Sequence, residues 1–468
     1  MNSIKFLATA FLVVVFQSQS LLAEQTMRLD YFHTGNANSE VFSIDQLIIE
    51  PLEWPGNINQ PEDKLLRGKY LFEITQQEKI VYSRSFSSIY GEWETTAEAS
   101  KMKRTFHESV RFPKPKGKFA LNLKKRDANN QFVLIWQTEL DADDYMNHRE
   151  QANYKQQVIA IENNGDPAKK VDLLILGDGY TAKEQPAFEK KARELSEYFL
   201  TSYPFSKRRK DINVWALAPN AIQSGVSRPS SGKYIDSPLG ATYDAFRSER
   251  YVLTYDNKNW RQVASSAPYD AVIIITNSET YGGGGIYGLY STAAANSDWA
   301  EYLFVHEFGH HFAGLADEYY TSSVAYQAPA KIVEPYEPNV TALLDPKNLK
   351  WKHMVSENTP LPTEWPKDKF EQHSLKYQKV RAKLRADNKP ESEMNQLFVK
   401  NQSIVEGLFS KHKNHQVVGA FEGANYQSQG YYRSSMNCVM FTRTKDFCGV
   451  CSEAVEEMID TYVVGASD

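Results

Sequence analysis

The stretch Asp298–Tyr320, DWAEYLFVHEFGHHFAGLADEYY, predicts an amphipathic helix followed by a sharp turn. Asp298 and Glu301 have the spacing of a capping box, which predicts that the helix begins there. Four aromatic or aliphatic residues repeat at helical spacing and predict one buried face: Phe304, Val305, Phe308 and Phe312. Gly314 favours a helix stop, because glycine readily takes the left-handed conformation that ends many helices.

Two histidines, His306 and His310, lie one turn apart on the opposite side of this helix. Imidazoles in that relation can chelate one metal ion, and the carboxylate of Glu307 can reach a water on that ion. The HExxH pattern on a helix therefore predicts a zinc site in which Glu307 is the general base. Because the chain turns back at Gly314, Asp317 can bring a third ligand to the same ion.

The alternative for this pair is two histidines that are satisfied by hydrogen bonds beside a core. HExxH arises by chance about 0.01 times in a chain of this length, and the helix, the glycine and the acid add context. The pattern therefore favours a metal site. His311 faces another direction and is not predicted to be a ligand.

The motif also resembles known families. HExxH, then Gly, a third ligand and a distant Met is the metzincin order, but the usual third ligand falls here at Ala316, which cannot bind metal. The variant HExxHxxxGxxDE resembles the bacterial IgA-peptidase family of zinc metallopeptidases (metallopeptidase family 64). Further segments are similar to that family, and the resemblance covers about residues 160 to 460: Leu176–Thr181, Gly282–Gly285, Glu337–Thr341, Gly419–Tyr426 and Tyr432–Met440.

The resemblance implies one catalytic zinc ion per chain, with His306, His310 and Asp317 as ligands and Glu307 as base. It implies Met436 as the Met-turn residue, whose thioether packs as an apolar floor under the metal. It also implies a metzincin-like peptidase domain. If Asp317 is not the third ligand, the neighbouring Glu318 is the leading alternative.

A tyrosine hydroxyl near the metal could stabilise a tetrahedral oxyanion, and three tyrosines are candidates: Tyr319, Tyr320 and Tyr432. In metzincin-like folds an edge strand precedes the active-site helix and pairs with the substrate. We expect the region Tyr281–Thr292 to form that edge.

Residues 159–468 read as an α/β domain. Three buried-type strands alternate with helices: Val171–Leu176, Ile212–Ala216 and Ala271–Thr276. Thr181 and Glu184 form a capping box that opens a helix to about Leu200. Residues 325–415 form a Pro-rich and helical insertion, whose basic stretch 367–386 is predicted to be a helix with a solvated face.

Residues 24–158 predict an all-β, sandwich-like accessory domain. Alternating segments separated by polar or Gly/Pro turns support this prediction: Tyr70–Ile74, Lys79–Phe86, Thr105–Phe112, Lys118–Leu123 and Gln131–Leu140. No catalytic pattern occurs among them.

Residues 1–23 predict a signal peptide, because Lys5 precedes an apolar run from Phe6 to Phe16 that is too short to span a bilayer. The mature chain is then periplasmic or secreted, without a membrane span. Three cysteines near the C-terminus predict one local disulfide without indicating the pairing: Cys438, Cys448 and Cys451. The CxxC spacing of the last two also occurs in zinc knuckles, which need a second ligand pair.

The composition bears on two classes of protein, nucleic-acid-binding proteins and disordered proteins. Lys+Arg is 53 and Asp+Glu is 58, so the net charge is 53 − 58 = −5, which gives no support to nucleic-acid binding. Aromatic residues make up 13%, too many for a disordered chain.

These observations predict an exported zinc endopeptidase that hydrolyses protein or peptide substrates. One alternative is a non-catalytic exported protein that binds glycan or protein and holds a structural metal. Another is a zinc amidase that acts on cell-wall peptides, because the same zinc chemistry serves any amide. The sequence indicates neither the natural substrate nor the oligomeric state.

Overall fold

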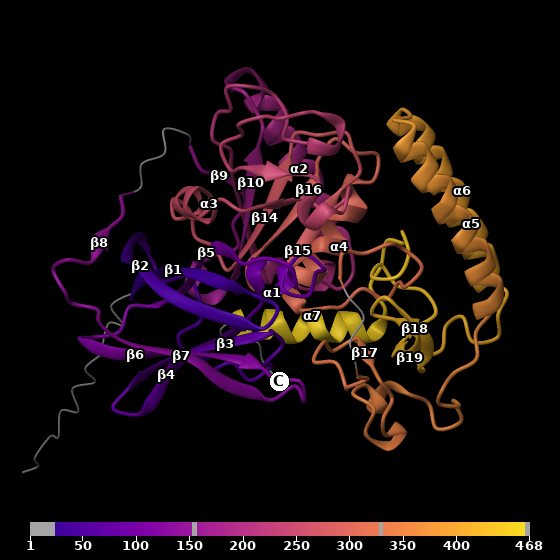
Figure 1. The fold of residues 1–468 in the computed structure, drawn as a ribbon, viewed down its shortest axis with the longest axis horizontal. Helices are drawn as coiled ribbons and strands as arrows, with labels where there is room; N and C mark the ends of the chain where they lie inside the picture. Colours follow the sequence, from indigo (N-terminus) through magenta and orange to yellow (C-terminus); the bar gives the residue numbers. More distant parts are fainter. Residues whose placement is uncertain (1–23, 152–156, 327–330, 464–468) are drawn as a thin grey trace, which may run out of the picture.

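The structure is a computed structural model that describes residues 24–151, 157–326 and 331–463 (Figure 1). A β-rich N-terminal part packs against an α/β part, and a pair of long helices stands at one side. The predicted signal peptide, residues 1–23, lies outside the described residues. Within these ranges no helix is long and apolar enough to cross a membrane.

Two four-stranded sheets form the N-terminal part. The first has the order β5-β1-β2-β8, with strands Arg104–Pro113, Gln25–Asn36, Ser39–Glu53 and His148–Arg149. The second has the order β4-β3-β6-β7, with strands Lys79–Phe86, Tyr70–Gln76, Lys118–Arg126 and Phe132–Asp141. The sheets share one buried core, to which Leu29 and Phe112 of the first and Phe72 and Leu121 of the second contribute.

One short helix, α1 (Ile89–Trp93), lies between β4 and β5. The N-terminal part is therefore β-rich and not built from strands alone. The side chain of Ser88 caps the helix by accepting a hydrogen bond from the amide of Gly91 at 3.0 Å. This helix contributes Gly91 and Glu92 to the lining of the cavity at the candidate site.

A six-stranded sheet forms the centre of the α/β part, with the order β15-β16-β14-β10-β11-β9. Its strands are Gly283–Ile286, Tyr290–Ala294, Ala271–Thr276, Val171–Asp178, Ile212–Leu217 and Ile159–Glu162. The inner four strands are parallel, and the two edge strands, β15 and β9, run antiparallel to their neighbours.

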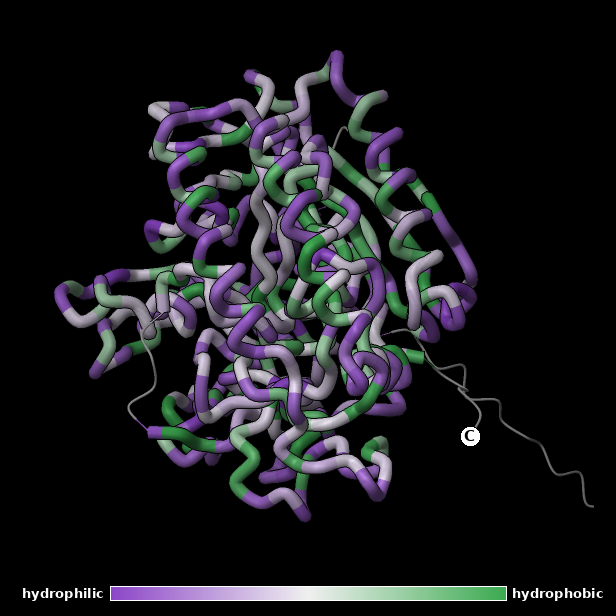
Figure 2. The backbone as a smooth tube through the Cα atoms, turned by 90° about the vertical axis from the view of Figure 1, so that its right-hand side faces the viewer, coloured by the Kyte–Doolittle hydropathy of each residue, from purple (hydrophilic) through white to green (hydrophobic). Residues whose placement is uncertain are grey.

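Alternate residues of the central strands face two different layers. Leu173 and Ile275 pack with the helices α2 (Gln185–Thr201) and α4 (Ala300–Ala313). The opposite face packs with α3 (Asn257–Ala264) and with residues of the N-terminal part such as Trp93 and Phe106. The N-terminal part therefore completes the core on one side of the sheet. In Figure 2 the central segments are white to green, whereas outer loops carry most of the purple.

The C-terminal segment contains the two long helices of the insertion, α5 (Lys367–Ala386) and α6 (Glu391–Phe409), and the helix α7 (Gly449–Tyr462), which packs against α4. A small sheet has the order β17-β19-β18, with strands Val340–Thr341, Gln427–Arg433 and Phe421–Ala424. A two-stranded ribbon joins β12 (Ala241–Thr242) to β13 (Leu253–Thr254). Single 3₁₀ turns occupy Pro167–Lys169, Ala182–Glu184, Phe205–Lys207, Arg209–Asp211, Pro229–Ser231, Ala245–Arg247, Pro346–Asn348 and Lys352–Met354.

The two predicted capping boxes have different outcomes. The amide and hydroxyl of Thr181 donate to Glu184 Oε2 at 2.8 Å and 2.7 Å, so that box is present, on a 3₁₀ turn that leads into α2. The box predicted for Asp298 and Glu301 is wrong. Helix α4 begins at Ala300 after Trp299, and no side chain caps its first turn. Its start is set instead by packing, since Ala300 and Leu303 are already buried in the core.

Candidate active site

Helix α4 places His306 and His310 side by side on one wall of a cavity. Each ring donates its Nδ1 hydrogen to a backbone carbonyl, His306 to Val439 at 2.9 Å and His310 to Leu315 at 2.6 Å. A carbonyl can only accept, so these bonds select the tautomer whose Nε2 lone pair is free. The two Nε2 atoms face each other at 3.3 Å.

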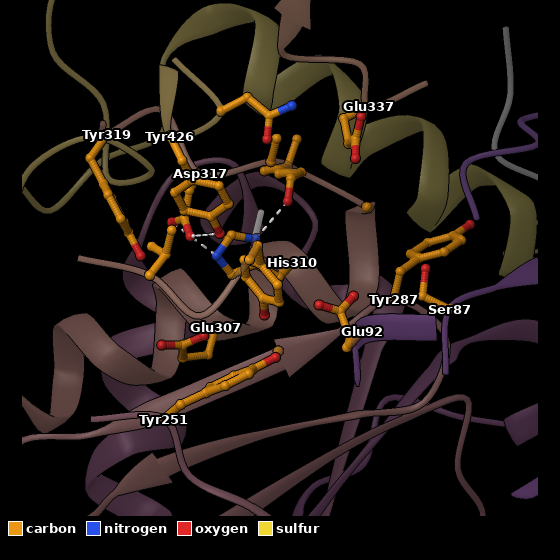
Figure 3. A pocket seen from close by; sticks show the side chains of 18 of the residues that line it. Ser87, Glu92, Tyr251, Tyr287, Glu307, His310, Asp317, Tyr319, Glu337 and Tyr426 are labelled. Carbon is orange, nitrogen blue, oxygen red and sulfur yellow. Dashed lines mark hydrogen bonds and ion pairs between the residues drawn. The ribbon is translucent and has the colours of Figure 1, made fainter. Parts of the chain in front are cut away.

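Asp317 reaches the same point from the loop that follows α4. Gly314 ends the helix with a φ of +64°, and its left-handed conformation turns the chain back. Asp317 Oδ1 lies 3.2 Å from the Nε2 atom of His306 and 3.2 Å from that of His310. Its second oxygen, Oδ2, accepts a hydrogen bond from the hydroxyl of Tyr426 at 2.6 Å, which orients the carboxylate (Figure 3).

These three atoms form a nearly equilateral triangle with edges of 3.2, 3.2 and 3.3 Å. Nitrogen or oxygen ligands about 2.0–2.1 Å from a zinc ion at tetrahedral angles lie about 3.3 Å apart. The donor set of two neutral imidazoles and one carboxylate therefore fits a tetrahedral zinc ion with a fourth, open position. The second-sphere hydrogen bonds to both histidines and to the carboxylate are those that usually orient metal ligands.

Glu307 lies beside this triangle without belonging to it. One of its oxygens and one nitrogen each of His306 and His310 are within 4.8 Å of one another, and its side chain lines the cavity (Figure 3). Burial raises the pKa of Glu307 above its ordinary value, although the neighbouring His306 and His310 act in the opposite direction. A carboxylate with a raised pKa is a better proton acceptor than an exposed one.

The cavity has a volume of about 590 Å³ and is bounded by both parts of the chain. Helix α1 of the N-terminal part contributes Glu92, and the strand end before it contributes Ser87. Tyr251, Tyr287 and Glu337 belong to the α/β part and complete the walls that Figure 3 shows. The pattern of the sequence placed no functional residue in the N-terminal part, so this contribution was missed.

The edge strand β15 lies directly against the site helix, as expected for the region Tyr281–Thr292. A Cβ atom at Gly285 would lie 2.3 Å from the carbonyl oxygen of Glu307, so glycine permits this close approach. Part of the outer edge is already covered, because Gly283 exchanges backbone hydrogen bonds with Arg250 and Val252 at 3.1 Å each. The edge that remains beside the cavity is therefore short.

The three candidate tyrosines lie in different places. Tyr319 lines the cavity, and its hydroxyl accepts a hydrogen bond from Arg250 Nη2 at 3.0 Å. Tyr320 packs over Gly423 and does not line the cavity. Tyr432 lies outside the lining too, in β19 opposite Thr341. Two of the three candidates are therefore not positioned to contact a group held at the histidines.

Met436 is fully buried in the main hydrophobic core of the α/β part. The methionine of the same loop that lies against the site helix is Met440, whose Sδ would be 3.0 Å from a Cβ atom at Gly309. The Met-turn role of Met436 stays a prediction.

Glu318, the alternative third ligand, turns away from the histidines. Its Oε1 accepts a hydrogen bond from Asn339 at 3.1 Å and lies 3.4 Å from the sulfur of Cys451. His311 also lies elsewhere, as expected. Its Nε2 accepts from the amide of Val272 at 3.0 Å, and burial lowers its pKa to about 4, which keeps the ring neutral.

Three of the segments that prompted the family resemblance hold the loop that carries Asp317. Asn339 bonds both the amide and the carbonyl of Ala316 at 2.9 Å. The amide of Asn425 donates to Asp317 O at 2.9 Å, and Met440 O accepts from the amide of Glu318 at 2.9 Å. The same segments supply Tyr426 and the carbonyl of Val439, which the spacing of HExxH alone could not identify.

A family model described as IgA Peptidase M64 matches residues 159–459, well over half of the chain. The chain belongs to the IgA peptidase M64 family. A second model, described as Peptidase M64 N-terminus, matches residues 17–137, so the two-domain layout of the chain is that of M64 proteins. No curated protein matched the sequence.

Membership confirms the resemblance drawn from the motif and indicates a peptidase, a hydrolase that acts on peptide substrates. The α/β part corresponds to the M64 peptidase region, and the β-rich part corresponds to the M64 N-terminal region. The candidate metal-binding groups His306 and His310 therefore lie in the part of the chain that defines the peptidase family.

Proposed function

We propose that this protein is an exported zinc-dependent endopeptidase in which His306, His310 and Asp317 bind one catalytic zinc ion. The observation that carries the proposal is the triangle of two Nε2 atoms and one carboxylate oxygen, with edges of 3.2–3.3 Å. A metzincin-like arrangement of the peptidase domain belongs to the same proposal, as does export through residues 1–23.

Zinc at this point would act as a Lewis acid that activates water and polarises the scissile carbonyl. Glu307 takes up the proton of the attacking water and delivers it to the leaving amine. Its position beside the histidines and its raised pKa suit both steps, because a general base works best with a pKa near the working pH. The Nδ1 bonds of His306 and His310 keep their rings oriented throughout.

Tyr319 is the tyrosine best placed to donate a hydrogen bond to the oxyanion that forms on the substrate. Its hydroxyl faces the cavity and accepts from Arg250, and an accepted bond from a cation makes a hydroxyl a stronger donor. Tyr426 is already committed to Asp317 and acts as a positioning residue.

A non-catalytic binding protein with a structural metal is less consistent with this geometry. Structural zinc sites are closed by four protein ligands, whereas the three residues of this triangle line the cavity and would leave a fourth position of the ion open. A carboxylate such as that of Glu307, close to the metal ligands but outside their triangle, has no role in a structural site.

The proposal is tested by removing the metal. We expect the protein to cleave an unfolded protein substrate, to lose that activity on treatment with a chelator, and to regain it with zinc. Calcium or magnesium should not restore activity, because the two imidazole ligands favour zinc over hard cations. Cleavage that survives complete removal of metal, verified by elemental mass spectrometry, would contradict the zinc-dependent mechanism.

Zinc affinity should depend on pH. In the metal-free protein burial lowers the pKa of His310, but the charge and hydrogen bond of Asp317, the charge of Glu307 and the carbonyl of Leu315 together outweigh burial and raise it to about 9. Zinc requires the neutral ring, so its affinity should rise by up to about tenfold per pH unit between about pH 6.5 and 9. Protonated His310 also stabilises the folded metal-free protein, and this contribution to the free energy of unfolding falls as the pH rises. It is fully present below about pH 6.5 and is lost as the pH rises through about 9.

Competition titration with a zinc indicator at several pH values measures the affinity, and chemical unfolding of the metal-free protein measures the stability. A zinc affinity that does not change between pH 6.5 and 9 would contradict the assignment of His310 as a ligand that carries a proton when the metal is absent.

A further inference from the structure

A second group of potential metal ligands lies behind the loop that carries Asp317. One ligand atom from each of Glu318, Cys438, Cys448 and Cys451 is within 4.8 Å of the other three. All four residues are buried, and Glu318, Cys438 and Cys451 are 0% exposed. The cysteines are free, so the disulfide expected from the sequence is not formed.

We propose that these four residues bind a second, structural zinc ion through three thiolates and one carboxylate. The sulfurs of Cys438 and Cys451 are 3.7 Å apart, and Cys451 Sγ lies 3.4 Å from Glu318 Oε1. In a tetrahedral zinc site, sulfurs bound at about 2.3 Å lie about 3.8 Å apart, and a sulfur and a carboxylate oxygen lie about 3.5 Å apart. The spacing therefore fits atoms that share one ion.

The order of the residues supports this assignment. Cys448 occupies the N-cap position of α7 without a capping hydrogen bond from its side chain, and Cys451 lies in the first turn. Their CxxC spacing is that of zinc knuckles. The second pair that such a site needs consists of Cys438, ten residues upstream, and Glu318, which the fold brings from the loop after α4. No spacing in the sequence could have revealed Glu318.

The surroundings of Glu318 favour the binding of a cation. Its Oε2 is buried and accepts no hydrogen bond from the residues that the structure describes. The guanidinium of Arg433 is close enough to influence the charge of Glu318, but it stacks on Trp365 and Phe441, and no ion pair joins it to Glu318 among the described residues. A buried carboxylate that forms no ion pair and leaves one oxygen without a hydrogen bond is costly, and a bound divalent cation removes that cost.

Hydrogen-bond donors also point at the sulfurs, as they do in structural zinc sites. The amide of Cys448 donates to Cys438 Sγ at 3.3 Å, and the hydroxyl of Ser434 lies 3.2 Å from Cys448 Sγ. Three thiolates, one carboxylate and one zinc ion carry a net charge of −2, which the buried guanidinium of Arg433 partly offsets.

The proposed ion would tie together the two loops that position the catalytic site, and this role rests on the proposed function. Glu318 directly follows Asp317, and Cys438 directly precedes Val439, whose carbonyl accepts from His306. The amide of Glu318 also donates to Met440 O at 2.9 Å. The second site therefore fixes the spacing between a first-site ligand and the carbonyl that orients another.

Metal content in three full-length proteins separates the two sites. We expect about two zinc ions per chain in the natural protein, about one in His306→Ala/His310→Ala, and about one in Cys448→Ser/Cys451→Ser. A histidine variant without zinc, or a cysteine variant that retains two ions, would overturn the second site. If the histidine variant keeps all the zinc of the natural protein, the catalytic site fails instead and the cysteine site stands.

Cobalt is the probe that identifies the ligands without relying on the folding of the cysteine variant. Metal-free His306→Ala/His310→Ala should bind Co²⁺ and show a thiolate-to-cobalt charge-transfer band. A cobalt spectrum without the thiolate band would overturn the proposal.

Counting the free thiols tests the cysteines directly. The natural protein, unfolded in the presence of a chelator but without a reductant, should show three reactive thiols. A single reactive thiol would mean that two cysteines form a disulfide, and it would overturn the proposal.

Discussion

Replacing Glu307 with Gln should lower kcat by about 10²- to 10⁴-fold, the range that general acid–base groups contribute, while zinc remains bound. Gln keeps the shape of the side chain but cannot take up a proton. The three groups that define the metal triangle stay in place, because none of their hydrogen bonds involves Glu307. Single-turnover cleavage of a peptide substrate, together with zinc content, measures both quantities.

A matched control lies on the same helix. Glu301 is exposed in the first turn of α4, so Glu301→Gln changes the same chemistry away from the cavity and should leave kcat within about twofold. If Glu307→Gln cleaves the substrate as fast as Glu301→Gln does, Glu307 is not the base and another group must accept the proton.

Replacing Asp317 with Ala should weaken zinc binding at the histidine site by more than about 100-fold, and activity at limiting zinc should fall with it. The reason is that Asp317 Oδ1 forms one corner of the triangle, 3.2 Å from both imidazole nitrogens. This loss of zinc affinity should exceed the 10- to 100-fold loss that usually follows when a residue that only hydrogen-bonds to a metal ligand is replaced. Competition with a zinc indicator, compared between the natural protein and Asp317→Ala with the cysteines intact in both, measures this loss.

Tyr426→Phe provides the graded comparison. It removes only the hydroxyl that orients Asp317 Oδ2, so zinc affinity should fall by about 10- to 100-fold, less than in Asp317→Ala. If the natural protein and Asp317→Ala bind zinc with equal affinity, Asp317 is not a zinc ligand. Glu318 would not replace it, because its carboxylate lies among the cysteines.

Local periodicity predicted the elements of this fold well. The bounds expected for the strands Lys79–Phe86 and Ala271–Thr276 coincide with β4 and β14, and those of the basic stretch 367–386 coincide with α5. Lys79–Phe86 belongs to the segments that alternate as strands do, Ala271–Thr276 is a continuous apolar run typical of a buried strand, and residues 367–386 form a basic, helix-prone stretch. The N-cap of α4 is Trp299, one residue after the predicted Asp298, because burial of Ala300 and Leu303 outweighed the capping preference of Asp298.

The residues of the site that lie close together in the sequence could be predicted, and those from distant segments could not. One helix carries His306, Glu307 and His310, so their spacing in the sequence was enough to predict that they lie close together. Tyr426, which orients Asp317, comes from a hairpin more than one hundred residues away, and only the family resemblance pointed to its segment. The disulfide expectation failed for a related reason. The sulfurs meet a carboxylate from a distant loop, which cysteine spacing cannot indicate.

The walls of the cavity bear on which proteins this peptidase can cut. His306 and Asp317 are only 5% and 6% exposed, and a space of about 590 Å³ between two domains holds a short length of chain but no folded domain. A folded target must therefore release a segment before cleavage, and the free energy of that local opening adds to the barrier. Linkers, hinges and frayed termini then become the preferred points of attack, whatever residues flank the bond. Selectivity would in this way be exercised through the flexibility of the substrate as well as through its side chains.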